Sequence, residues 1–192
     1  MSRMIVALVL TLGCATAAAA QGMAGSAQSG DPQVNAIKVQ LGIAKNYVTK
    51  SADKLSEELY AYAPTTEVRS AGKILAHIAD ANYMMCSMAK GEKSPYEMFA
   101  LEKGKTTKAD IQKAVGDSYA YCEQALEGLT AASAAEKVDL FGMPQTKLSV
   151  VAFAAAHGFE HYGNLVTYMR LKNIVPPSSE PRKPAASQGS GM

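Results

Sequence analysis

Apolar residues recur at alternating steps of three and four along four stretches of the chain, and this spacing limits what the chain can fold into. Residues three and four apart lie on one face of an α-helix, so each stretch predicts an amphipathic helix with an apolar face to bury. The first helix is expected after Pro32, and Pro64 ends it. Its apolar face consists of Ile37, Leu41, Ala44, Val48, Ala52, Leu55, Leu59 and Tyr62.

The second and third helices carry start and stop signals. Ser70 is a good N-cap residue, and the helix that follows it is expected to stop at Gly91. Thr107 caps the third helix, with Asp110 three positions on, which resembles a capping box. The two helices are expected to bury Ile74, Ile78, Ala81, Met85, Met88, Ile111, Val115, Tyr119, Cys122, Leu126 and Leu129.

The fourth helix is the longest apolar stretch of the mature sequence. It is expected to begin at about Thr146 or Ser149 and to run to about Lys172, because Pro176 and Pro177 forbid its continuation. Its buried face is predicted to contain Val151, Ala155, Phe159, Tyr162, Val166 and Met169.

The helices are joined by two long connections, at 91–105 and 131–145, which contain glycine and proline. Four such helices without a convincing strand pattern or internal repeat predict an all-α fold, an antiparallel four-helix bundle over residues 33–175. The flanks differ in composition. We expect residues 21–32 to be a flexible leader and residues 176–192 a disordered tail.

Residues 1–20 have the three parts of a secretory signal peptide: Arg3, an apolar run from Met4 to Leu12, and small residues up to Ala20. The apolar run is shorter than the roughly 20 residues that span a bilayer, so cleavage near Ala20 is expected rather than a permanent anchor. The sequence therefore predicts a periplasmic or secreted protein with no membrane association after cleavage.

The charge of the mature chain is nearly balanced. The whole sequence carries a formal charge of +2, which falls to +1 once Arg3 is removed. That balance gives no electrostatic reason to expect nucleic acid as a partner. Cys86 and Cys122 remain in a compartment that permits disulfides, where either a bridge or two buried thiols would fit.

The histidines are the residues most suited to chemistry. His157 and His161 lie four apart and share one face of the fourth helix, and His77 lies on the second. If these helices pack together, three imidazoles converge on one divalent metal ion and leave positions open for water or substrate. The alternative is that each histidine is a hydrogen-bonded or surface residue. The chain has only three histidines, which favours the metal site.

Carboxylates near the histidines have two interpretations. Glu160 or Asp80 could accept a hydrogen bond from a metal-bound imidazole, although a solvated surface position is the interpretation we favour for each. A di-iron bundle would need further carboxylate ligands in Glu-x-x-His pairs, which the helices lack. Methionines at helical spacing, such as Met84 and Met88, are typical of core packing rather than of copper binding.

Two stretches carry a family resemblance: Gly72 to Asp80, and, more specifically, His157 to Pro177. With them the chain resembles the DinB/YfiT-like superfamily of metal-binding four-helix bundles, over about residues 33–178. The resemblance implies a divalent ion, zinc or nickel in most cases, held by His77, His157 and His161. Characterised relatives include thiol-dependent transferases and isomerases, and relatives are often dimers, so a homodimer is an expectation.

Two functional hypotheses follow. The first is a metal-dependent hydrolase or thiol-dependent transferase that acts on an unknown small molecule outside the cytoplasm. The alternative is a non-catalytic bundle that binds metal or a small ligand. In either case the apolar faces do not depend on the histidines, so the core is expected to stand without metal. Without metal, the histidines are expected to protonate below about pH 6.

Overall fold

The computed structural model describes residues 31–181 and confirms an all-α fold built around four long helices. The long helices are α1 (Pro32–Lys54), α2 (Ala71–Lys90), α4 (Lys108–Glu127) and α6 (Lys147–Leu171). The shorter elements are η1 (Glu58–Ala61), α3 (Ala100–Gly104), α5 (Ala131–Ala134), β1 (Lys137–Leu140), β2 (Met143–Thr146) and η2 (Pro177–Ser179). The predicted signal peptide and most of the predicted leader lie outside the described residues.

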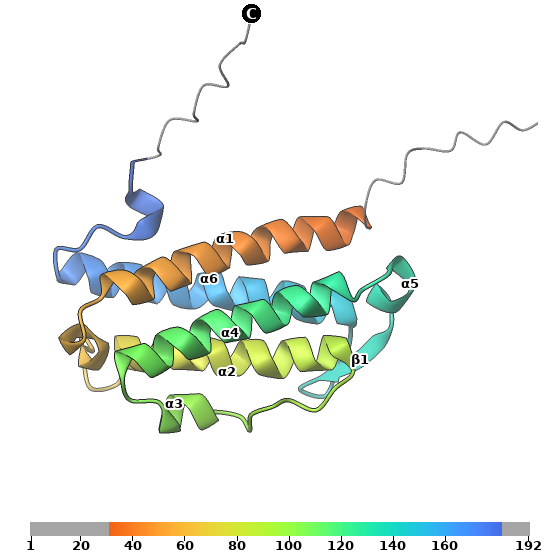
Figure 1. Cartoon of the computed structure of the whole chain (residues 1–192), viewed down its shortest axis with the longest axis horizontal. Helices are drawn as coiled ribbons and strands as arrows, with labels where there is room; N and C mark the ends of the chain where they lie inside the picture. Colours follow the sequence, from red (N-terminus) through yellow and green to blue (C-terminus); the bar gives the residue numbers. More distant parts are fainter. Residues whose placement is uncertain (1–30, 182–192) are drawn as a thin grey trace, which may run out of the picture.

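The directions of the helices differ from the antiparallel arrangement that the sequence predicted. The Asn82 side chain donates a hydrogen bond to Ser118, and one turn further along both helices Cys86 is joined to Cys122. Pairs that advance together show that α2 and α4 are parallel, and Figure 1 shows α1 and α6 running the opposite way. The helices α2 and α4 are parallel because the crossover that joins them, residues 91–107, runs back along the length of the bundle.

The first helix is shorter than predicted. Its backbone turns extended at Leu55, and the segment expected to continue the helix to Tyr62 instead contains η1. The Lys108 ammonium donates to the carbonyls of Asp53 (3.1 Å) and Leu55 (2.6 Å), which satisfies carbonyls that a helix end leaves free. Tyr60 is buried, and its hydroxyl donates to the carbonyl of Ala52 at 2.9 Å.

The predicted caps are confirmed. The hydroxyls of Ser70, Thr107 and Thr146 each accept from a backbone N–H in the first turn, and Gly91 ends α2 with a φ of 73°. The buried faces largely follow the prediction. The exceptions are seven residues that are only partly buried: Ile37, Leu59, Tyr62, Met88, Leu129, Phe159 and Val166.

Gly158 allows α6 to lie close to its neighbours. A Cβ atom at this position would stand 2.8 Å from the Tyr119 hydroxyl on α4 and 3.4 Å from the Ala44 side chain on α1. The first of these distances is a clash, so a larger residue fits only if the buried Tyr119 side chain or the helices shift. This close approach fixes the part of α6 that carries the two histidines.

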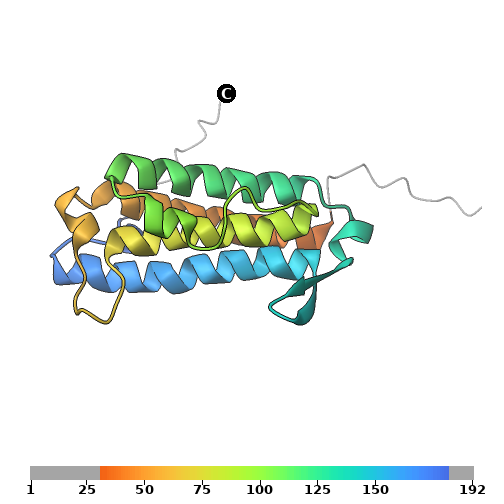
Figure 2. The ribbon, with the colours of Figure 1, turned by 90° about the horizontal axis from the view of Figure 1, so that it is seen from below.

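Both connections contain regular structure that the sequence analysis did not predict. The crossover includes α3, and residues 131–145 include α5 and an antiparallel hairpin in which Leu140 pairs with Met143. The two residues of the hairpin turn, Phe141 and Gly142, have φ values of 55° and 80°. Figure 2 shows the crossover over α2, with α4 and α6 on either side.

The segment after α6 is also more ordered than predicted. Pro177 is buried, and the Tyr162 hydroxyl donates to Ser178 Oγ (2.7 Å) and accepts from the Ser178 N–H (2.8 Å). The prediction of a disordered tail is therefore wrong for residues 176–181, because these hydrogen bonds and apolar contacts hold the chain against α6. Residues 182–192 lie outside the described part.

A disulfide between Cys86 and Cys122 links α2 to α4, which resolves the two alternatives that the sequence left open. Within residues 31–181 the helices are too short or too polar to cross a membrane.

Candidate metal centre

The three histidines predicted as metal ligands lie together between α2 and α6. One ring nitrogen from each of His77, His157 and His161 lies within 4.8 Å of the other two. The ring centroids of His77 are 5.1 Å from His157 and 4.9 Å from His161. The antiparallel packing of α2 against α6 produces this convergence, and the resulting group could hold a metal ion.

The pair on α6 presents matching nitrogens. His157 Nε2 and His161 Nε2 are 3.0 Å apart, which is close enough for both to reach one ion at the usual bond length of about 2.0–2.1 Å. His161 Nδ1 lies 3.3 Å from the Asn164 amide. If the amide is turned so that its oxygen takes this place, it accepts a hydrogen bond from the Nδ1–H that His161 carries when Nε2 binds a metal.

Glu102 of α3 contacts His77 at its Nδ1 atom. Its Oε2 lies 3.3 Å from His77 Nδ1, and neither atom has a hydrogen-bond partner elsewhere in residues 31–181. The other Glu102 oxygen accepts from Arg69 Nε at 2.9 Å. A carboxylate behind a ligating imidazole fixes its tautomer and leaves Nε2 for the metal.

Asp80 has a different role from the one predicted. Its side chain is buried, and its two oxygens accept from the N–H groups of Leu101 (3.0 Å) and Glu102 (2.9 Å). Asp80 therefore holds the start of α3 in place and positions Glu102, so the prediction of a solvated carboxylate is wrong here. Glu160 is exposed, as predicted.

The imidazoles resist protonation more than the sequence suggested. Burial lowers the pKa of His157 to about 4, and the neighbouring imidazoles and Arg69 act in the same direction. Burial likewise lowers the pKa of His77 and of His161 below the ordinary value. The expected protonation below about pH 6 is therefore set too high, and the histidines should protonate only at a lower pH. The site favours the neutral imidazoles, which are the form that binds metal.

Comparison with known protein families gives a direct result. The model of the DinB superfamily matches residues 40–165, well over half of the sequence. The chain belongs to the DinB superfamily.

Relatives in this superfamily agree with the fold. Protein YjoA of Bacillus subtilis (strain 168), described as uncharacterized, is 27% identical over 130 residues, which are 66% of this chain and 82% of YjoA. The crystal structure of YjoA superposes with a TM-score of 0.62 and 23% identity, over 78% of this chain and all of YjoA. The crystal structure of a DinB-like protein from Bacillus cereus ATCC 10987 superposes with a TM-score of 0.65 and 18% identity, over 74% of this chain and 95% of that protein.

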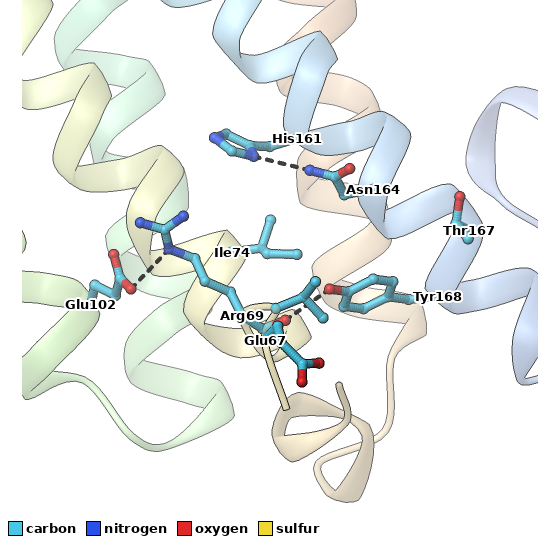
Figure 3. A pocket seen from close by; sticks show the side chains of 9 residues that line it. Glu67, Arg69, Ile74, Glu102, His161, Asn164, Thr167 and Tyr168 are labelled. Carbon is cyan, nitrogen blue, oxygen red and sulfur yellow. Dashed lines mark hydrogen bonds and ion pairs between the residues drawn. The ribbon is translucent and has the colours of Figure 1, made fainter. Parts of the chain in front are cut away.

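The histidine group of this DinB protein lies between two cavities. His161 lines a polar, open cavity of about 580 Å³ together with Arg69, Glu102 and Asn164. Figure 3 shows Arg69 and Glu102 on one side of it, and His161 and Asn164 across from them on α6. His77 and His157 line a smaller apolar cavity of about 170 Å³.

Sequence reasoning found the three histidines and missed the residues that surround them. Glu102, Arg69 and Phe99 come from connections, where no periodic pattern marks a buried or functional position. One signal was present. Asp80 stands alone among apolar residues of α2, and a carboxylate in such a run indicates a buried partner.

Proposed function

We propose that this DinB protein is a metal-dependent enzyme that acts outside the cytoplasm on a small molecule, either as a hydrolase or as a thiol-dependent transferase. The observation that carries the proposal is the group of three neutral imidazoles, supported by a carboxylate behind His77. Neutral imidazoles suit zinc, nickel, iron and copper, and of these we propose zinc or nickel, as the family resemblance implies.

A bound divalent ion would supply a low pKa for a coordinated water or thiol. Residues of the protein would orient the imidazoles and attract the substrate. Glu102 keeps the Nδ1 proton on His77, and Asn164 steadies His161. Arg69 lies at the wall of the polar cavity, where its charge would attract an anionic group of the substrate.

Accessibility favours an enzyme over a closed metal carrier. Within residues 31–181 the group that could hold a metal consists of three residues, and Glu102, which contacts His77 Nδ1, is not one of them. A site with three protein ligands keeps a position open for water or substrate, and the two adjacent cavities provide room for one.

Two observations support a periplasmic or secreted location. The disulfide between α2 and α4 is of a kind that forms and persists in oxidising compartments. Residues 1–20 have the composition of a signal peptide.

Metal analysis of the purified mature protein tests the proposal. After a zinc or nickel soak we expect about one ion per chain, and His161→Ala should lose it. Glu160→Ala is the matched control, because Glu160 is the exposed neighbour on the same helix and should leave metal uptake unchanged. Retention of the ion by His161→Ala would contradict the assignment of the site.

Activity is tested separately with thiol-conjugation substrates and with esters and amides. His77→Ala should abolish turnover while its circular dichroism shows that the helices remain. Turnover at the wild-type rate by a folded, metal-free His77→Ala protein would refute a metal-dependent reaction.

A further inference from the structure

The smaller cavity beside the histidines is built almost entirely from aromatic and thioether side chains. Its walls, other than the imidazoles of His77 and His157, are Asp80, Ala81, Met84, Met85, Met98, Phe99, Phe141 and Phe153. An apolar cavity of about 150 Å³ accommodates a benzene molecule, so the 170 Å³ available here match one six-membered ring. Methionine and phenylalanine are also the side chains that contact ring faces and edges most favourably.

Two of these phenylalanines hold strained backbone conformations. Phe99 has a φ of 65° and Phe141 a φ of 55°, in the left-handed region that side chains larger than glycine rarely adopt. Phe99 also stacks on His77, with ring centroids 5.8 Å apart and an interplanar angle of 11°.

The position of Phe141 is the more informative of the two. It is the first residue of a two-residue hairpin turn with positive φ at both positions, where asparagine and glycine are preferred. The turn would therefore be easier to form without the aromatic ring. Phe141 is 59% exposed, so burial in the core does not explain the ring either. Its contribution to the wall of the apolar cavity explains why a phenylalanine stands in the turn.

The polar cavity on the other side of the imidazoles contains one positively charged side chain, Arg69, beside the carboxylates of Glu67 and Glu102. Arg69 donates through Nε to Glu102, and within the described part of the chain its two terminal nitrogens have no hydrogen-bond partner. In Figure 3 its guanidinium extends toward His161. The planar fork of arginine matches the geometry of a carboxylate.

We propose that the site binds a small aromatic carboxylate. Its ring would occupy the apolar cavity between Phe99 and Phe141, and its carboxylate would lie at the ion and face Arg69. The inference rests on the proposed function, because the three imidazoles that would hold the ion line the two cavities. It adds the chemical class of the ligand, which the histidines alone do not specify.

Calorimetric titration of the zinc-loaded mature protein tests this inference with three probes. 3-Phenylpropionate has the ring and the charge, 3-phenylpropanamide has only the ring, and propionate has only the charge. We expect 3-phenylpropionate to bind at least about tenfold more tightly than either of the others, because each lacks one of the two contacts. Removing zinc should weaken its binding by a similar factor.

Two variants locate the ligand. Phe141→Asn should weaken 3-phenylpropionate roughly 3- to 10-fold through the lost ring contact, while zinc affinity stays unchanged and the melting temperature is equal or higher. The matched control is Met143→Thr, on the same hairpin and 53% exposed but not part of the cavity wall, which should bind the probe as the wild type does. Arg69→Gln should reduce the preference for the acid over the amide, and an unchanged preference would overturn the role of Arg69.

The outcomes separate the inference from the function on which it rests. If zinc binds in a manner that depends on His161 but the three probes bind alike, the ligand class is wrong and the metal site stands. Unchanged binding by Phe141→Asn would overturn the placement of the ring. Failure of zinc to bind through His161 would overturn both the inference and the proposed function.

Discussion

Replacing Glu102 by glutamine tests the most specific contact of the metal centre. Outer carboxylates of this kind typically contribute 10- to 100-fold to metal affinity. The Nδ1–Oε2 distance of 3.3 Å is longer than the 2.7–2.9 Å of a strong charge-assisted hydrogen bond, and Arg69 shares the carboxylate. We therefore expect Glu102→Gln to lose metal affinity at the lower end of this range, by about tenfold, or about 1.4 kcal/mol.

Competition against a chromogenic zinc chelator measures this loss. Glu67→Gln is the control, because Glu67 lines the same polar cavity without an ion pair to the histidines, and its zinc affinity should be unchanged. The Glu102 charge raises the pKa of His77, so Glu102→Gln should lower that pKa in the metal-free protein, as followed by NMR. Weaker proton binding by itself would favour metal uptake. A loss of zinc affinity together with a lower pKa would thus identify orientation as the cause. Equal zinc affinity of Glu102→Gln and the wild type would refute the reasoning.

Four further predictions concern stability. Between about pH 6.5 and pH 4, His157 is protonated in the unfolded chain and neutral in the metal-free native state. The free energy of unfolding of the metal-free protein should therefore fall as the pH is lowered through that window. In urea unfolding, the midpoint of His157→Gln should depend less on pH than that of the wild type. Gly158→Ala should cost about 1–3 kcal/mol in urea unfolding because its Cβ meets the Tyr119 hydroxyl, whereas Gly163→Ala, on the same helix in open space, should stabilise. Alanine at both disulfide cysteines, which are 36 positions apart, should lower the free energy of unfolding by about 4 kcal/mol in the same assay; an unchanged midpoint would show that the bridge contributes nothing. Chelation of the metal should lower the melting temperature and leave far-UV circular dichroism intact, and a loss of helical signal would show that the core depends on the ion.

The sequence was sufficient for the helices whose ends are marked locally. Ser70, Thr107 and Thr146 cap helices by contacts within a single turn, so local chemistry determines them. The end of α1 was not predictable in this way, because Lys108, which satisfies the carbonyls of its last turn, comes from a helix 53 or more positions away. The same holds for the parallel course of α2 and α4, which depends on the path of an irregular crossover.

The residues of the site also fall into those that local sequence patterns predict and those that only tertiary contacts bring into place. His157 and His161 were recognisable because the helical repeat alone brings them together, and His77 because no other histidine was present. Glu102 reaches His77 only because Asp80 holds the start of α3. That arrangement is a tertiary contact between residues more than 20 positions apart, and no periodic pattern encodes it.

The disulfide also determines how the segment that carries Glu102 can move. Cys86 and Cys122 lie on either side of the crossover, so the whole of residues 91–107 forms an arch whose two feet stand on covalently joined helices. The disulfide prevents α4 from separating from α2. The arch itself is held to α2 without a covalent link, by the two backbone hydrogen bonds to Asp80, by the stacking of Phe99 on His77 and by buried Leu101. We predict that any opening of the arch away from the histidines occurs as a small cooperative unit while the bundle stays closed. Such a flap would let a ligand enter and leave without partial unfolding, and exchange of the Leu101 and Glu102 amide protons would report its opening directly.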